Sequence, residues 1–171
     1  MLKESIILLV MAILLSLGIN LFSPNQITVI GQYRSVSTGD DPVIPPDAIE
    51  GDPRFIDLAV AQMNHATGSA VFVDARDPEE FVCGTIPGSV NLPFEYLPEE
   101  DLESYVDSAL GAIGRDYPLV VFCSGEECDL SLHMGRLFQD MNFSSIEIFF
   151  GGAREWEEAG LEMERIEQCG E

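Results

Sequence analysis

The spacing of hydrophobic positions along the chain alternates between two patterns, and each pattern predicts a different element. Short apolar runs have the length of buried strands at 70–73, 90–93, 119–122 and 146–150. Apolar residues at helical spacing predict helices at 53–63, 78–81, 102–113, 130–141 and 153–159. Strands that alternate with helices are typical of an α/β domain, in which a parallel sheet is covered by helices on both faces.

The first of these helices is expected to begin at Asp52 and Pro53. Aspartate is a favoured N-cap residue, and proline is favoured at the first helical position because it lacks the N–H that would otherwise be unpaired. The following residues supply an apolar face at helical spacing: Phe55, Ile56, Ala59, Val60 and Met63.

The N-terminal segment, residues 1–22, is almost wholly apolar from Ile6 to Phe22. It predicts a transmembrane anchor, and a cleaved signal peptide with Ser16 and Gly18 near its cleavage site is the alternative. Lys3 precedes the apolar run, so the positive-inside tendency predicts a single-pass protein of the cytoplasmic (inner) membrane. The domain at 51–171 would then face the periplasm or exterior, behind a linker at 23–50 that is rich in proline and glycine and has one possible short strand at 27–30.

The charge of the chain limits its partners. The formal net charge is −22, with 30 acidic residues against 8 lysines and arginines. Binding to nucleic acid phosphates needs clustered Lys and Arg, so no nucleic acid partner is expected. Adhesion to an anionic membrane surface is disfavoured for the same reason, which leaves the N-terminal helix as the expected membrane contact.

Cysteine usage favours thiol chemistry over a metal site. The four cysteines do not have the spacing of a zinc finger or ribbon, and there are only two histidines. A domain of this size does not need a disulfide framework. We therefore expect reactive thiols or one local disulfide, and neither a metal nor an organic cofactor.

Cys123 lies between the predicted strand at 119–122 and the predicted helix at 130–141. Unpaired N–H groups and the helix dipole stabilise an anion at such a position, which would lower the pKa of the thiol and favour the reactive thiolate. The alternative is a buried structural cysteine at the end of a strand. The loop that follows Cys123 contains Ser124, Gly125, Glu126, Glu127, Cys128 and Asp129.

Three segments together resemble the rhodanese homology domain. The first runs from Val73 to Pro93 and is similar to the family pattern D-x-R-x-x-x-E-[YF]-x-x-G-H-I-P-G-A-x-N-[IL]-P. The second is the Cys123 loop, with Ser131 near the start of the next helix. The third is Gly151-Gly152 followed by Trp156 and Gly160, similar to the family's G-G-x-x-x-W-x-x-x-G. The resemblance covers about residues 53 to 163 and implies a three-layer domain with a central parallel sheet.

The resemblance implies sulfur transfer, in which Cys123 takes sulfane sulfur from a small donor as a persulfide and passes it to a protein thiol or another nucleophile. The other motif residues are interpreted as structural: Asp74 accepts hydrogen bonds from the next turn, and Arg76 pairs with Glu80 across a helical turn. Gly151-Gly152 allows a close backbone approach, and Trp156 anchors the core.

The chain departs from the family pattern at three places. Thr85 replaces the usual histidine. Glu126, Glu127 and Asp129 make the loop acidic, which predicts poor use of anionic thiosulfate and a raised cysteine pKa. Cys128 either resolves an oxidised Cys123 as a disulfide or fills space under the loop. Two further functions therefore remain open: a thiol redox enzyme that uses Cys123 and Cys128, and a non-catalytic binding module.

Overall fold

The computed structural model describes residues 41–111, 113–125 and 128–167, together with Ser5, Met11 and Cys169. The chain divides into two units, Met1–Ser35 and Val36–Glu171. The predicted anchor and the possible strand at 27–30 lie outside the described residues, apart from Ser5 and Met11. Within the part of the chain that is described, no helix combines the length and hydrophobicity needed to span a membrane.

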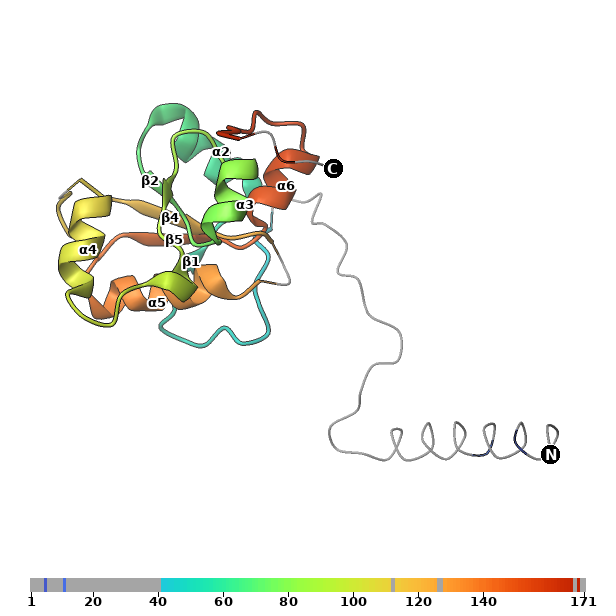
Figure 1. Ribbon diagram of the computed structural model, residues 1–171, viewed down its shortest axis with the longest axis horizontal. Helices are drawn as coiled ribbons and strands as arrows, with labels where there is room; N and C mark the ends of the chain where they lie inside the picture. Colours follow the sequence, from blue (N-terminus) through green and yellow to red (C-terminus); the bar gives the residue numbers. More distant parts are fainter. Residues whose placement is uncertain are drawn as a thin grey trace. The chain divides into compact units, whose positions relative to one another are not determined.

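A five-stranded parallel sheet forms the centre of the second unit, in the order β1-β5-β4-β2-β3 (Figure 1). Its strands are β1 (Arg54–Phe55), β2 (Val71–Asp74), β3 (Val90–Asn91), β4 (Leu119–Phe122) and β5 (Ile146–Phe149). All four residues of β4 are buried, as expected for the central strand of a parallel sheet that is covered on both faces. The predicted α/β class with a central parallel sheet is therefore confirmed.

Helices cover both faces of this sheet (Figure 1). Side chains that alternate along the strands separate two cores, because successive residues of a strand point to opposite faces. Val73, Leu119 and Val121 pack in the core with α4 (Leu102–Ala109) and α5 (Leu130–Asp140). Phe72, Val120 and Phe122 pack in the core with α2 (Leu58–Thr67) and α6 (Gly152–Glu158).

The remaining short elements are α3 (Pro78–Cys83), which follows β2, and the 3₁₀ turn η1 (Phe94–Tyr96), which follows β3. Trp156 of α6 is buried and makes edge-to-face ring contacts with Phe72 and Phe149. The expectation that Trp156 anchors the core is therefore confirmed.

The expected helix start at Pro53 is wrong. Arg54 and Phe55 instead form β1 and pair with Glu147 and Ile148 of β5. The helix begins four positions after Arg54, at Leu58, and Asp57 is its N-cap, since the Asp57 carboxylate accepts a hydrogen bond from the Val60 N–H at 2.8 Å. An aspartate does cap this helix, as expected, but it is Asp57 and not Asp52.

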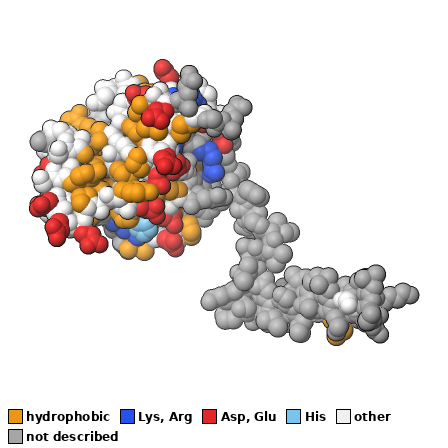
Figure 2. All heavy atoms as spheres, in the orientation of Figure 1, with side chains coloured by type: hydrophobic (Ala, Val, Ile, Leu, Met, Phe, Trp, Pro, Cys, Tyr) orange, Lys and Arg blue, Asp and Glu red, His pale blue; other side chains and the backbone are white. Residues whose placement is uncertain are grey.

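Part of the predicted linker packs against the domain. Arg136 of α5 forms an ion pair with Asp52 at 2.7 Å and donates to the carbonyl of Asp47 at 3.0 Å. The Gln139 amide donates to the carbonyl of Gly51 at 3.0 Å. Residues 47–52 are therefore held along α5. Over the visible face of the domain, acidic side chains greatly outnumber basic ones (Figure 2).

Candidate active site

The candidate site lies where β4 ends and the loop to α5 begins (Figure 1). Ligand sites of open parallel sheets are found at the carboxyl ends of the strands. Cys123 is the first residue after β4, and the loop continues to Asp129, which immediately precedes α5. Glu126 and Glu127 lie outside the described residues, so the acidic rim predicted for this loop stays a prediction.

The Cys123 thiol is fully buried. Its Sγ donates to the carbonyl of Cys128 at 2.8 Å, and it lies 3.5 Å from the Ser131 hydroxyl. Burial raises the pKa of Cys123 well above its ordinary value, and a hydrogen bond to the Cys128 side chain raises that pKa further. The lowered pKa expected from the position between strand and helix is therefore wrong. The raised pKa expected from the acidic loop is correct in direction, but its largest cause is burial.

Cys128 has the opposite surroundings. It is partly exposed, and its N–H donates to the carbonyl of Gly125 at 2.8 Å. The hydrogen bond that its sulfur accepts from the Cys123 thiol lowers the pKa of Cys128 to about 6. Both cysteines are free thiols. Cys128 is therefore the thiol of this pair that ionises first.

A cavity of about 520 Å³, which we call the loop cavity, opens beside this loop. Residues from α3, the loop, α6 and the C-terminal segment line it: Arg76, Glu80, Cys83, Gly84, Ser124, Gly125, Cys128, Ala153, Arg154, Glu157, Met163 and Arg165. Cys128 is one of these lining residues, and Cys123 is not. A molecule in the loop cavity thus meets Cys128 before it meets Cys123.

The start of α6 docks directly onto the loop. The Ala153 N–H donates to the carbonyl of Cys123 at 2.9 Å, and the Arg154 N–H donates to the carbonyl of Ser124 at 3.1 Å. Gly152 has a φ of +66°, and a β-carbon there would collide with the Cys123 carbonyl oxygen and lie 2.8 Å from the Gly125 nitrogen. The close approach that the sequence predicted for the glycine pair is present at Gly152.

Asp74 and Arg76 form a buried ion pair beneath this site. The guanidinium of Arg76 donates to both carboxylate oxygens of Asp74, with the shortest contact at 2.6 Å. The Thr85 hydroxyl donates to Asp74 at 2.8 Å, as does the Arg76 N–H at 3.0 Å. The interpretation of Asp74 as an acceptor for the next turn is confirmed, and Thr85 is buried as its partner.

The predicted pairing of Arg76 with Glu80 is wrong. Arg76 turns back to Asp74 and donates to the carbonyl of Gly84 at 2.7 Å. Glu80 instead accepts a hydrogen bond from the Ser124 hydroxyl at 3.0 Å, which links α3 to the loop. The sequence contains no signal for that contact, because its two residues are 44 positions apart.

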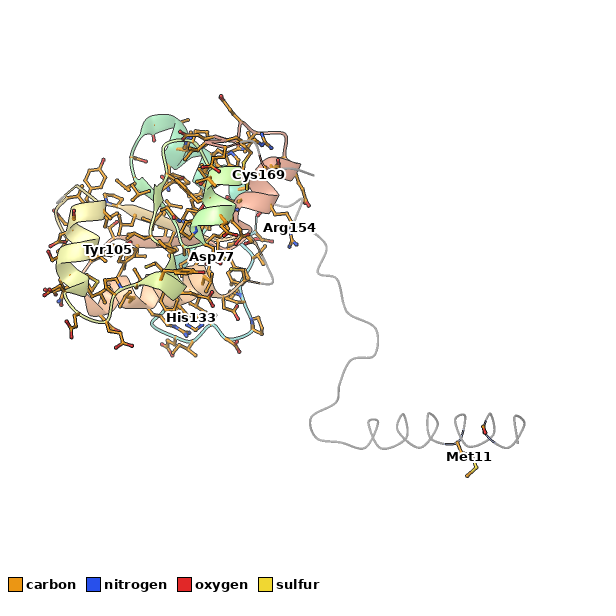
Figure 3. All side chains as sticks on the ribbon, viewed as in Figure 1. Met11, Asp77, Tyr105, His133, Arg154 and Cys169 are labelled. Carbon is orange, nitrogen blue, oxygen red and sulfur yellow. A yellow bond between two sulfur atoms is a disulfide. The ribbon has the colours of Figure 1, made fainter. Side chains whose placement is uncertain are left out.

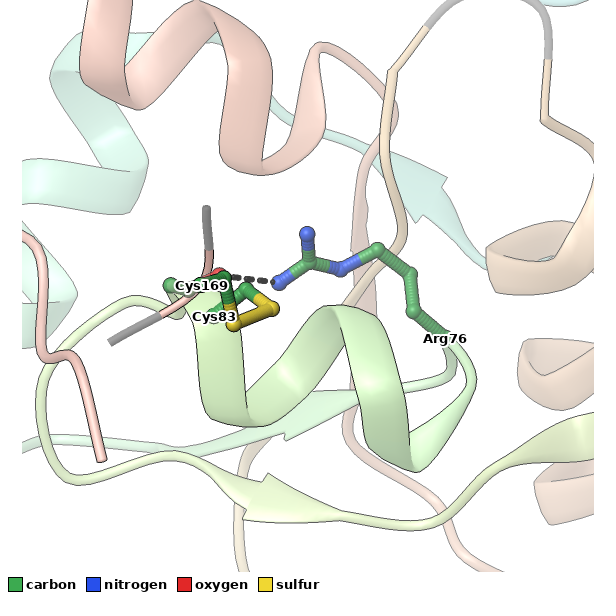
Figure 4. The surroundings of a disulfide bond; sticks show 4 residues. Arg76, Cys83 and Cys169 are labelled. Atoms are coloured by element: carbon green, nitrogen blue, oxygen red, sulfur yellow. Dashed lines mark hydrogen bonds between the residues drawn. A yellow bond between two sulfur atoms is a disulfide. The ribbon is translucent and has the colours of Figure 1, made fainter. Parts of the chain in front are cut away.

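A disulfide joins Cys83 at the end of α3 to Cys169, and Arg76 lies beside it (Figure 4). Its partners are 86 positions apart, so this bond is not the local disulfide given as one of two expectations, and Cys123 and Cys128 are free thiols as the other expected. Backbone hydrogen bonds hold the same C-terminal segment: the Thr85 and Glu164 main chains exchange two bonds of 2.9 Å, and the Ile166 N–H donates to Val82 at 2.9 Å. This segment forms one wall of the loop cavity through Met163 and Arg165.

Comparison with known proteins identifies the family. The family model of the rhodanese-like domain matches residues 58–159, which is more than half of the chain. The chain belongs to the rhodanese-like family. Its sequence is 26% identical over 122 residues to the HTH-type transcriptional regulator Rv0324 of Mycobacterium tuberculosis, a match that covers 71% of this chain and 50% of that protein. The chain thus spans about half the length of this curated relative.

Solved structures show the same fold. The human single-domain sulfurtransferase TSTD1 is 26% identical, with a TM-score of 0.53, over 63% of this chain and 97% of that chain. EanB, solved as a cysteine persulfide with ergothioneine, has a TM-score of 0.57 at 15% identity, over 64% of this chain and 27% of that chain. The three-layer rhodanese-like fold is therefore established.

Proposed function

We propose that this protein is a sulfurtransferase that carries sulfane sulfur as a persulfide on Cys123. The observation that carries the proposal is the position of Cys123 at the carboxyl end of β4, under a loop that borders a cavity of about 520 Å³. Family membership and the likeness to a human sulfurtransferase support it. In the first half-reaction the Cys123 thiolate attacks the sulfane sulfur of a donor: a new S–S bond forms on Cys123, the donor's bond to that sulfur breaks, and the rest of the donor leaves as an anion.

The second half-reaction returns the enzyme to its thiol form. An acceptor thiolate attacks the outer sulfur of the persulfide, and Cys123 leaves as a thiolate, so no net oxidant or reductant is consumed. No cofactor is needed for either step. Because Cys123 is buried and Cys128 faces the loop cavity, the segment that carries Cys128 has to shift before a donor reaches the Cys123 thiol.

Intact-mass analysis of the full-length protein tests this function. After incubation with inorganic polysulfide, the protein should gain the mass of one sulfur atom and lose it to an added thiol. Cys123→Ala should gain none, whereas Cys128→Ala should still be loaded. If Cys123→Ala is loaded and turned over as well as the unmodified protein, the assignment is wrong.

One observation favours a second function, a thiol redox enzyme. Cys128 lines the loop cavity, has a pKa of about 6 and is hydrogen-bonded to Cys123. A dithiol cycle would use a Cys128 thiolate as the attacking group and Cys123 as the resolving thiol. The variant Cys128→Ala distinguishes the two functions. Sulfur transfer through Cys123 should continue without the Cys128 thiol, whereas a dithiol cycle should stop.

We further propose that the domain functions outside the cytoplasm, held by the N-terminal segment at 1–22. The disulfide between Cys83 and Cys169 supports this placement, because stable disulfides are typical of oxidising compartments and rare where glutathione and thioredoxin keep thiols reduced. The apolar run after Lys3 supports it independently.

A further inference from the structure

We propose that Arg154 binds an anionic group, such as a carboxylate, on the organic thiol that exchanges sulfur with Cys123. The inference rests on the proposed sulfur transfer and specifies its substrate class. The thiol end of such a molecule would face the loop, and its carboxylate would lie at Arg154 in the loop cavity.

Cationic side chains are concentrated in this cavity. Three of the eight lysines and arginines in the chain line it, namely Arg76, Arg154 and Arg165. Two of the 30 acidic residues, Glu80 and Glu157, belong to the described lining of the cavity. In a chain of net charge −22, the described lining of this cavity is far less acidic than the chain as a whole.

Arg154 differs from its two neighbours in the cavity. The guanidinium of Arg76 pairs with Asp74, and that of Arg165 pairs with Glu157, both at 2.6 Å. Three further arginines elsewhere in the described domain also pair with carboxylates: Arg54, Arg115 and Arg136. Arg154 is thus the one arginine at 41–111, 113–125 and 128–167 with no described carboxylate within 4.0 Å.

The backbone places Arg154 over the loop. Its N–H donates to the Ser124 carbonyl, and its guanidinium nitrogens lie 3.3 and 3.4 Å from the position that a β-carbon on Gly125 would occupy. Its side chain is exposed at the outer surface of the domain (Figure 3). A guanidinium whose backbone is held in place, and which has no carboxylate partner among the described residues, is suited to bind a ligand carboxylate through two parallel hydrogen bonds.

The size of the loop cavity indicates an organic molecule. A volume of about 520 Å³ is in the range of small-molecule sites and exceeds what a small inorganic anion fills. In an organic thiol the carboxylate can lie at Arg154, away from the sulfur atom. A loop that is acidic beside Cys123 therefore does not exclude such a molecule. In the transfer the acceptor thiolate attacks the outer sulfur of the Cys123 persulfide, forms an organic persulfide and releases the Cys123 thiolate.

The test uses two acceptors that differ in charge. The full-length protein is loaded with inorganic polysulfide, freed of excess donor, and mixed with either 3-mercaptopropionate or 2-mercaptoethanol. The loss of sulfur from the protein is followed by mass in a single turnover, with rates expressed per thiolate. The variants are Arg154→Gln and, as a matched control, Arg115→Gln, which removes one positive charge in the turn before β4, at a residue that does not line the cavity.

We expect the carboxylate acceptor to be preferred, and this preference to fall roughly threefold to tenfold in Arg154→Gln. Arg115→Gln should keep it, and added salt should weaken it. An unchanged preference in a normally loaded Arg154→Gln protein would refute the role of Arg154 and leave sulfur transfer intact. Failure of the unmodified protein to take up sulfur would instead refute the proposed function together with this inference.

Discussion

At the scale of single residues, the two loop cysteines differ in burial, in pKa and in access to the loop cavity, and neither has all the properties that a catalytic thiol needs. Cys123 has the protected position and a raised pKa, whereas Cys128 has access to the cavity and a pKa lowered to about 6. The cause is local: Cys123 is fully buried, and its interaction with the Cys128 side chain raises the pKa of Cys123 and lowers that of Cys128. The sequence indicates that both cysteines belong to one loop, but it contains nothing about which of them faces the cavity.

The lowered pKa predicts a pH profile for Cys128. Its thiolate fraction rises as the pH increases through about 6, so the rate of alkylation by neutral iodoacetamide should have its midpoint near that pH and level off above it. Peptide mapping after timed labelling measures this rate at Cys128. In Cys123→Ala the hydrogen-bond donor is lost, and the midpoint should move toward the ordinary cysteine value of about 8.5.

Cys123→Ser is the matched control for this experiment, since its hydroxyl can still donate to Cys128. It should keep part of the lowered midpoint. A midpoint near the ordinary value in the unmodified protein would contradict the hydrogen-bonded thiol pair.

The residues of the first family segment show how far the sequence can be interpreted. The role of Asp74 follows from its position at the end of β2, because the turn that donates a backbone hydrogen bond to its carboxylate is adjacent in the chain. The partner of Arg76 is not predictable in the same way. Arg76 is close enough in the chain to form an ion pair with either Glu80 or Asp74. It pairs with Asp74, which is buried and also accepts a hydrogen bond from Thr85.

At the scale of elements, the docking of α6 on the loop after β4 depends on Gly152. Gly152→Ala should destabilise the domain by more than about 2 kcal/mol, because the added methyl group meets the Cys123 carbonyl at a positive φ. It should also reduce sulfur loading, since the loop is displaced. Urea unfolding followed by circular dichroism measures the free energy of unfolding.

Gly160→Ala is the matched control for this prediction. Gly160 has a similar φ of +74°, but a β-carbon there would have no neighbour within 4 Å. This variant should therefore lose only about 1 kcal/mol from backbone strain and keep its loading. Equal losses in the two variants would show that close packing on the loop contributes nothing.

The elements differ in how well the sequence predicts them. β2, β4 and β5 are predicted at nearly their observed bounds, because strands covered on both faces are rich in apolar residues, and β4 is apolar throughout. β1 is missed, since it has two residues at the edge of the sheet and depends on pairing with β5 from the far end of the chain. The predicted helix at 102–113 is too long: α4 ends at Ala109, and the next turn contains Gly111 at a φ of +71°.

At the scale of the whole molecule, the disulfide between Cys83 and Cys169 ties α3 to the C-terminal segment. Its pairing is not predictable from spacing, because it depends on how the fold returns that segment to α3. The double variant Cys83→Ala/Cys169→Ala should unfold with a free energy about 2–4 kcal/mol lower, because the bond closes a long loop of the unfolded chain.

Guanidinium unfolding with and without a reductant measures this difference. The reductant should lower the stability of the unmodified protein and leave that of the double variant unchanged. Thiol titration of the denatured, unreduced protein should find the two free cysteines, Cys123 and Cys128. If the reductant has the same effect on both proteins, the disulfide is not the source of the stability.

The N-terminal segment and the disulfide both bear on where in the cell the domain works. The apolar segment at 1–22 and the Cys83–Cys169 disulfide support the same placement for different reasons, one through membrane insertion and the other through redox conditions. We therefore expect the chain to fractionate with membranes, and protease added from the outer side alone should cleave the domain. A membrane-impermeant thiol reagent should label Cys128 in intact spheroplasts.

Lys3→Glu provides a sharper test of topology than fractionation alone. It removes the only lysine, which precedes the apolar run, and should weaken the orientation signal, so that a larger fraction of domains escapes external protease. Domains retained inside should lack the Cys83–Cys169 disulfide, because cytoplasmic thiols are kept reduced. Recovery of the unmodified protein in the soluble cytoplasmic fraction with this disulfide formed would contradict both the membrane placement and the redox argument that supports it.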